Sequence, residues 1–211
     1  MRASVEAAGR KFARLVTGAV VARPWLWRVF RTAIRRQFGS LATSWEGRLG
    51  PEALAPLEAA LERLGAPARK ALDLGTGTGK AARVVARRFP EAEVVGVDLA
   101  PEMIREAGRL LPAELRNRVR LEVADGARLP FGDGEFDLVV LQNAIPFFDE
   151  LARVTAPGGK VIFAFSRGPE TPIWVPPATL RARLAAVGFT EVEELSAGEG
   201  SAVLAVRGNP G

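Results

Sequence analysis

A glycine-rich turn followed by an isolated carboxylate is the part of the sequence best suited to binding a ligand. Residues 70–80 read KALDLGTGTGK, an apolar run that ends in three alternating glycines, Gly75, Gly77 and Gly79. Glycines in such a turn let a ligand approach the backbone closely. Asp98 ends the next apolar run and follows Gly79 by 19 residues, a spacing that places a carboxylate on the hydroxyls of a ribose. The two segments together predict a nucleoside site at the carboxyl ends of adjacent strands.

Three ligand classes compete for this turn. A phosphate-binding loop is disfavoured because Leu74 stands where its first glycine is required and Ala81 where Ser or Thr must follow the lysine. A dinucleotide fingerprint can be fitted to the last two glycines and Ala82, which keeps NAD as a minor interpretation. Asp73 precedes the glycines, and its carboxylate would repel a pyrophosphate but suits a cationic amino-acid ligand.

The composition limits the chemistry that the chain can perform. Its 211 residues include no cysteine, no histidine and no tyrosine. Thiolate chemistry, a zinc site and a Ser-His-Asp triad are therefore excluded, and no metal site is expected. Any proton transfer falls to Asp, Glu, Lys, water or the substrate itself.

Short apolar runs alternate with helical stretches from residue 68 onward. The runs expected to form strands are 70–74, 93–97, 118–123, 136–141, 160–165, 190–195 and 201–206. Parallel strands need crossover connections, so strands that alternate with helices predict a parallel sheet covered on both faces. The last two runs are expected to form a hairpin at the sheet edge. The predicted fold class is α/β, with a doubly wound, mostly parallel seven-stranded sheet.

Five motifs, in this order, resemble those of the class I S-adenosylmethionine-dependent methyltransferases over roughly residues 70–206. The segments that carry the resemblance are LDLGTGTG at 72–79, VDLAPEM at 97–103, VADGARLPF at 123–131, FDLVVLQN at 136–143 and ELARVTAPGGKVI at 150–162. The resemblance implies a Rossmann-like methyltransferase fold, S-adenosylmethionine as the cofactor, and an enzyme that transfers its methyl group.

The resemblance also implies roles for individual residues. Asp73 would lie near the methionyl ammonium, Asp98 would hold the ribose, and Asp125 would accept a hydrogen bond from the adenine amino group. The other cofactor-binding residues that it implies are Gly75, Thr76, Gly77 and Gly79 in the turn, Leu99 and Met103 against the adenine, Gly126 and Ala127 beside Asp125, and Gln142 at a strand end. Each acid also has a purely structural interpretation, as a helix cap or an Asx turn.

The N-terminal part of the chain is basic and helical. Residues 1–40 carry nine basic residues and one acid, so their net charge is +8 and that of the remainder is −3. Apolar residues at helical spacing predict amphipathic helices that are broken at Pro24. The expected helices are 4–22, 25–38 and 51–64. The predicted division is a basic helical extension or lid over 1–66 and a cofactor-binding domain over 67–211.

The basic helices have three candidate roles. They are expected to form a lid or a homodimer contact, or to make peripheral membrane contact through residues 1–40, because basic faces with tryptophans suit an anionic membrane surface. Nucleic acid is disfavoured as a partner because stacking aromatics and an extended basic stripe over the core are lacking. The interrupting arginines exclude a membrane span and disfavour a secretory signal, although an arginine-rich start also resembles an organelle transit peptide. The expected location is cytoplasmic, with peripheral attachment to the inner membrane surface as a variant.

Methyl transfer from a sulfonium is an in-line displacement, so the protein needs mainly to align donor and acceptor and to exclude water. Without His or Tyr, the acceptor is expected to be nucleophilic already, as an amine or enolate is, or to lose its proton to solvent. Candidate acceptor contacts are Trp45, Glu46 and Asn143, and no catalytic residue is assigned. The predicted function is methylation of a small-molecule or lipid-like acceptor, and the alternative is a non-catalytic or regulatory S-adenosylmethionine-binding module.

Overall fold

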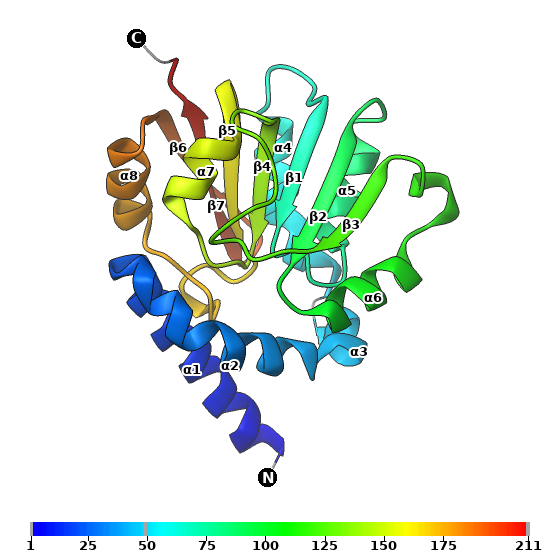
Figure 1. The fold of residues 1–211 in the computed structure, drawn as a ribbon, viewed down its shortest axis with the longest axis vertical. Helices are drawn as coiled ribbons and strands as arrows, with labels where there is room; N and C mark the ends of the chain where they lie inside the picture. The colour runs from blue at the N-terminus through cyan, green and yellow to red at the C-terminus, as the bar shows by residue number, and fades with distance from the viewer. Residues whose placement is uncertain (1, 49, 210–211) are drawn as a thin grey trace.

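A computed structural model describes residues 2–48 and 50–209, in which seven strands form one mixed sheet (Figure 1). The strands are β1 (Lys70–Leu74), β2 (Glu93–Asp98), β3 (Val119–Val123), β4 (Phe136–Gln142), β5 (Thr155–Phe165), β6 (Phe189–Ala197) and β7 (Gly200–Arg207). Their order across the sheet is β3-β2-β1-β4-β5-β7-β6. The first five strands pair in parallel, while β7 is antiparallel to both β5 and β6. The predicted doubly wound, mostly parallel seven-stranded sheet with an edge hairpin is confirmed.

Helices cover both faces of the sheet and one of its ends. The α-helices are α1 (Arg2–Ala22), α2 (Trp27–Gly39), α3 (Ala42–Trp45), α4 (Ala55–Glu62), α5 (Lys80–Arg88), α6 (Pro101–Leu110), α7 (Phe148–Val154) and α8 (Pro177–Ala186). Short 3-10 turns span Pro24–Leu26, Glu46–Arg48, Pro51–Leu54, Ala113–Leu115 and Gly168–Glu170. The helices α7 and α8 share one hydrophobic cluster with the sheet, and α4 and α5 share another with its opposite face.

The two clusters arise because successive strand residues point to opposite sides of a sheet. In β1, Ala71 packs with α4 and α5 whereas Leu72 packs with α7 and α8, and both side chains are fully buried. The parallel strands therefore read as nearly continuous apolar runs, which is typical of a sheet covered on both faces.

Most elements lie within two residues of the predicted bounds, and two of them differ in a way that matters for the fold. The expected helix over 51–64 is a 3-10 turn followed by α4, which ends at Glu62. The expected strand over 160–165 begins earlier, because β5 already pairs with β4 at Thr155 and then passes through an irregularity before Lys160. The Ala-Pro-Gly-Gly segment is therefore part of a distorted strand and not a separate turn.

The helices α1 and α2 form a hairpin that lies across one end of the sheet (Figure 1). Pro24 lies between them and begins the connecting 3-10 turn, which confirms the predicted break. The amide of Gln37 donates to the carbonyl of Gly9 at 3.0 Å, and Phe12 packs edge-on against Phe30. Within the described ranges, no helix is long and apolar enough to cross a membrane.

Part of the N-terminal charge is used inside the molecule. The Arg14 guanidinium donates to the carbonyls of Pro169 and Thr171 at 2.5 and 3.0 Å, and Arg10 donates to that of Glu170 at 3.2 Å. These bonds tie α1 to the segment that follows β5. The helix α4, in contrast, packs into the sheet itself, while the division of the chain at residue 66 stays a prediction.

We predict that Leu61→Ala in α4 lowers the free energy of unfolding by about 2–5 kcal/mol, because it removes a fully buried side chain from the cluster shared with the sheet. Urea denaturation followed by circular dichroism measures the change. The matched control is Leu15→Ala, since Leu15 is 62% exposed and its truncation should cost less than about 0.5 kcal/mol. Equal losses in the two variants would contradict the packing of α4 against the sheet.

Candidate functional site

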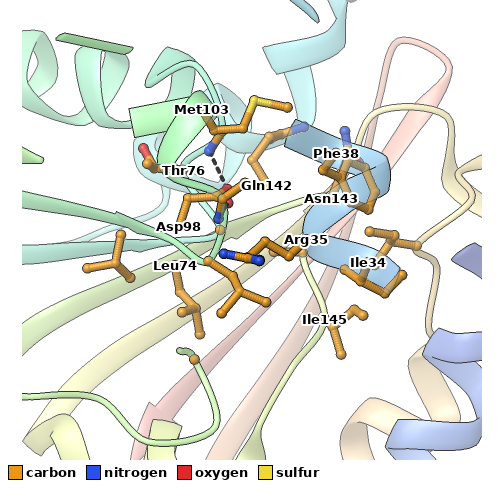
Figure 2. A pocket seen from close by; sticks show the side chains of 18 of the residues that line it. Ile34, Arg35, Phe38, Leu74, Thr76, Asp98, Met103, Gln142, Asn143 and Ile145 are labelled. Carbon is orange, nitrogen blue, oxygen red and sulfur yellow. Dashed lines mark hydrogen bonds between the residues drawn. The ribbon is translucent and has the colours of Figure 1, made fainter. Parts of the chain in front are cut away.

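A cavity lies at the carboxyl ends of β1, β2 and β4, between the sheet and α2 (Figure 2). Figure 2 shows Ile34, Arg35 and Phe38 on the helix, opposite Leu74 and Asp98 from the strands. This edge is where doubly wound sheets bind ligands, because the strand order reverses there between neighbouring crossovers. The sheet supplies one wall of the cavity and the N-terminal hairpin supplies the other.

The glycine turn after β1 has a backbone that only glycine adopts easily. Gly75, Gly77 and Gly79 have φ angles of +75°, +55° and +80°. A Cβ atom added to Gly75 would lie 2.6 Å from the Cβ of Ala144, which is a steric clash. The N–H groups of Gly75 and Thr76 both donate to the carbonyl of Val97 at 2.9 Å. The turn is thus held against the end of β2, where it forms the floor of the cavity.

Asp98 presents a fixed carboxylate to the cavity. It accepts hydrogen bonds from the N–H of Gly77 at 3.0 Å and from the N–H of Ala100 at 2.8 Å. Burial raises its pKa above the usual value, while these backbone hydrogen bonds oppose the rise. A carboxylate has about four lone-pair sites, so two further acceptor positions remain for hydroxyl groups of a ligand.

Asp73 lies behind the glycine turn and does not line the cavity. One carboxylate oxygen accepts from the Thr76 hydroxyl at 2.5 Å and from the N–H of Ala82 at 2.9 Å, whereas the other oxygen is buried without a hydrogen-bond partner. Burial raises the pKa of Asp73 to about 6, in spite of those two hydrogen bonds. The structure gives Asp73 a part in joining the turn to the start of α5, and its predicted contact with an ammonium group stays a prediction.

Asp125 is held by α2. Its carboxylate accepts from the indole N–H of Trp27 at 2.7 Å and from the N–H of Ala127 at 3.0 Å, and the Arg31 guanidinium lies 3.4 Å away. The Trp27 ring also packs edge-on against Phe147, with 5.1 Å between ring centroids. Neither Asp125 nor Ala127 lines the cavity, but Gly126 between them does.

The two candidate acceptor residues after α2 point in different directions. Trp45 lines the cavity, and its indole nitrogen would lie 3.4 Å from a Cβ atom added to Gly77. Glu46 turns away and accepts from the Thr78 hydroxyl at 2.7 Å and from the Arg83 guanidinium at 2.8 Å. Glu46 therefore links the N-terminal extension to α5, and its predicted contact with an acceptor stays a prediction.

The amide side chains after β4 line the cavity but are held from behind. The Gln142 amide donates to the Ser166 hydroxyl at 2.9 Å and to the carbonyl of Ala53 at 3.1 Å, and the Asn143 amide donates to Ser166 at 2.7 Å. Asn143 has a φ of +54°, in the left-handed region that asparagine tolerates better than most residues. Leu99 and Met103 supply an apolar wall on the side of β2, and their predicted contact with an adenine stays a prediction.

Sequence reasoning predicted a lid formed by the N-terminal helices but not which residues of α2 line the cavity. The residues of α2 that line the cavity are Trp27, Ile34, Arg35 and Phe38. The apolar residues at 27, 34 and 38 have helical spacing, so an amphipathic helix was visible in the sequence. The spacing does not show which part of the molecule this face of the helix covers. The turn residue Gly79 also lies outside the lining, and Thr78, Lys80, Ile145 and Phe147 belong to it without having been predicted. Among the described residues, no cluster of acids could hold a metal ion.

Comparisons with known proteins agree with this geometry. Residues 71–159 match the model of a family described as methyltransferase domain. The malonyl-[acyl-carrier protein] O-methyltransferase of Halorhodospira halophila is 39% identical over 150 residues, 67% of this chain and 50% of that protein. The demethylmenaquinone methyltransferase of Thermus thermophilus is 45% identical over 102 residues, 44% of this chain and 46% of that protein. The chain thus spans about half the length of the curated relatives it matches.

A solved structure shares the fold. The crystal structure of an S-adenosylmethionine-dependent methyltransferase from Aquifex aeolicus superposes with a TM-score of 0.66 and 18% sequence identity. The match covers 78% of this chain and 97% of that one. The N-terminal hairpin lies outside the segment that the family model matches, and the glycine turn, Asp98 and Asp125 lie inside it.

We predict that Asp73→Asn removes a pH dependence of stability. The pKa of Asp73 rises from 3.8 to about 6 on folding, so the folded state binds the proton more tightly and gains stability as the pH falls from 7 to 5. Relative to the wild type, the variant should therefore lose about 1 kcal/mol between these two pH values. Urea denaturation at pH 5, 6 and 7 measures the difference.

The matched control is Asp149→Asn, because Asp149 is exposed in the first turn of α7. Its stability relative to the wild type should change much less over the same range. If Asp73→Asn and Asp149→Asn follow the same curve, the buried charge of Asp73 does not limit stability at neutral pH.

Proposed function

The chain belongs to the class I S-adenosylmethionine-dependent methyltransferases, and from this premise we propose that it transfers the methyl group of S-adenosylmethionine to a small-molecule or lipid-like acceptor. The observation that carries the proposal is the meeting, in one cavity, of the glycine turn, the Asp98 carboxylate and apolar walls. The relatives are named as methyltransferases of malonyl-[acyl-carrier protein] and of demethylmenaquinone, and these names support an acceptor of this class.

The residues present suit this cofactor. A Cβ atom added to Gly126 would lie within 3.1 Å of Leu74 and Phe147, so only glycine lets these two apolar side chains of the cavity lining pack this closely against the loop after β3. Asp98 would hold the ribose hydroxyls, and Leu99 and Met103 would pack against the adenine. Bound S-adenosylmethionine supplies a methyl group activated by its sulfonium.

The contribution of the protein is alignment and exclusion of water. The Trp27 and Arg31 contacts to Asp125 hold α2 over the cavity, and Ile34 and Phe38 present apolar surface from the same helix. Asp98 is the one carboxylate in the described lining, and its hydrogen bonds from two backbone N–H groups fix it at the wall. With Asp98 assigned to the ribose, the described lining holds no second carboxylate for removing a proton, so we expect the acceptor to be nucleophilic already or to lose its proton to solvent.

We predict that Asp98→Ala weakens binding of S-adenosylhomocysteine by about 10- to 100-fold, since a charged hydrogen-bond partner of the ribose is lost. Isothermal titration calorimetry measures the affinity, and circular dichroism checks the fold because Asp98 also holds the turn. Asp98→Asn keeps one carbonyl acceptor, and its affinity for S-adenosylhomocysteine should fall between those of the wild type and Asp98→Ala. The control Asp133→Ala removes an exposed carboxylate outside the cavity and should bind like the wild type.

The same variants test the reaction. Wild-type protein incubated with methyl-labelled S-adenosylmethionine and an extract of its source cells should place label in the organic phase, and Asp98→Ala should not. Binding without transfer into any fraction would leave a cofactor-binding module. Failure of the wild type to bind either S-adenosylmethionine or S-adenosylhomocysteine would overturn the proposed function.

We further propose that the outer face of the N-terminal hairpin contacts an anionic membrane surface, where a lipid-like acceptor would be met. Trp25 in the 3-10 turn and Val29 in α2 are 63% and 62% exposed, and neither of them lines the cavity. Exposed Arg28 and Arg36 flank this face. Tryptophan and aliphatic side chains between arginines suit the interface of an anionic bilayer.

We predict that the protein floats with vesicles containing about one third phosphatidylglycerol but not with vesicles of phosphatidylcholine alone. Trp25→Ser combined with Val29→Ser should reduce flotation at least about fivefold. The matched control is Val123→Ser, because Val123 is 53% exposed on β3. Equal partitioning of all forms would reject the membrane contact, and self-association of the wild type without flotation would assign the face to a homodimer.

A further inference from the structure

The cavity is lined by three ionisable side chains among the described residues, and two of them are already engaged. Asp98 accepts from two backbone N–H groups, and the Lys80 ammonium donates to the carbonyl of Glu46 at 2.9 Å. The third is Arg35 on α2, and none of the described residues forms a hydrogen bond or an ion pair with its guanidinium. Figure 2 shows the Arg35 side chain reaching from α2 into the cavity, toward Leu74 and Asp98.

A guanidinium in this position favours an anionic ligand. Arginine stays charged in proteins and presents a planar fork of donors that matches a carboxylate. The side chains near it on α2 and after β4 include Ile34, Phe38 and Ile145, which cannot pair with a charge. Its neighbour Arg31, in contrast, already has Asp125 as its partner. Arg35 is therefore the cation of this helix that is placed to bind a group entering the cavity.

The engagement of the other ionisable side chains in the lining also favours an anionic acceptor. With Asp98 assigned to the ribose and Lys80 hydrogen-bonded to Glu46, a neutral acceptor would have to lose its proton to water. An acceptor oxygen that is already ionised needs no proton transfer, because it forms the new bond to the methyl carbon with its own lone pair. The carbon–sulfur bond then breaks with its electron pair left on sulfur, and no proton has to leave.

We propose that Arg35 is a specificity-determining residue that pairs with a carboxylate of the acceptor. The inference rests on the proposed function and narrows its acceptor to an apolar molecule with an anionic oxygen. A carboxylate could also come from the amino-acid part of the cofactor, and this source predicts a different result in the experiment below.

The experiment uses the full chain saturated with S-adenosylhomocysteine and titrated with hexanoate or hexanamide, two probes of nearly equal shape that differ in charge. We expect hexanoate to bind at least about tenfold more tightly than hexanamide, as charged hydrogen bonds imply. Arg35→Gln should bring the two affinities together, and Arg35→Lys should restore part of the preference. The control Arg36→Gln makes the same change at the next position of α2, outside the cavity lining, and should keep the full preference.

Each other outcome has a definite meaning. Equal affinities in the wild type, or no binding of either probe up to about 10 mM, would overturn the proposal, as would a preference that survives Arg35→Gln. A loss of S-adenosylhomocysteine affinity in Arg35→Gln without loss of probe discrimination would assign the guanidinium to the cofactor. Failure of the wild type to bind S-adenosylhomocysteine would instead refute the proposed function. This outcome is distinct from a failure of the Arg35 proposal, because it is measured before hexanoate or hexanamide is added.

Discussion

The N–H groups of Gly75 and Thr76 share one acceptor, the carbonyl of Val97, and the rest of the site depends on this clamp. It holds a left-handed turn against the end of β2, so that Gly77 can donate to Asp98 and α5 can begin immediately after the turn. Asp73 holds the same turn through its hydrogen bonds from Thr76 and Ala82. Its carboxylate is buried there, and the burial raises its pKa. The glycine turn and the Asp98 carboxylate are thus one structural unit, because moving either of them would break the hydrogen bond between Gly77 and Asp98.

The second wall of the cavity belongs to a different part of the chain. The hairpin of α1 and α2 is tied down by Arg14 at the segment after β5 and by Trp27 at Asp125. A basic N-terminus therefore has two physical roles, since some arginines satisfy backbone carbonyls or a carboxylate inside the molecule while others remain on the outer face. Net charge alone could not separate these roles, because both kinds of arginine lie on the same two helices.

The sheet was predictable from the sequence because its signals are local. Each parallel strand is a short apolar run bounded by a turn, and the glycines of the first turn need φ values that other residues avoid. Ten of the residues singled out in the sequence line one cavity. They are Gly75, Thr76, Gly77, Asp98, Leu99, Met103, Gly126, Gln142, Trp45 and Asn143. The direction of a side chain did not follow, as Glu46 shows, because its partner Arg83 is brought near only by the tertiary fold. The rotation of α2 was unpredictable for the same reason.

The residues assigned to the cofactor and the residue assigned to the acceptor also come from different parts of the chain. The matched family segment, residues 71–159, contains the turn, Asp98 and Asp125, whereas Arg35 comes from a helix that precedes it by more than 30 residues. A helix joined to the sheet through a few contacts can change its inner face without disturbing the turn, because the turn hydrogen-bonds to β2 and not to α2. Similarity within the matched segment therefore bears more directly on the cofactor than on the acceptor. For this chain, the acceptor is best sought through the charge and shape that α2 contributes to the cavity.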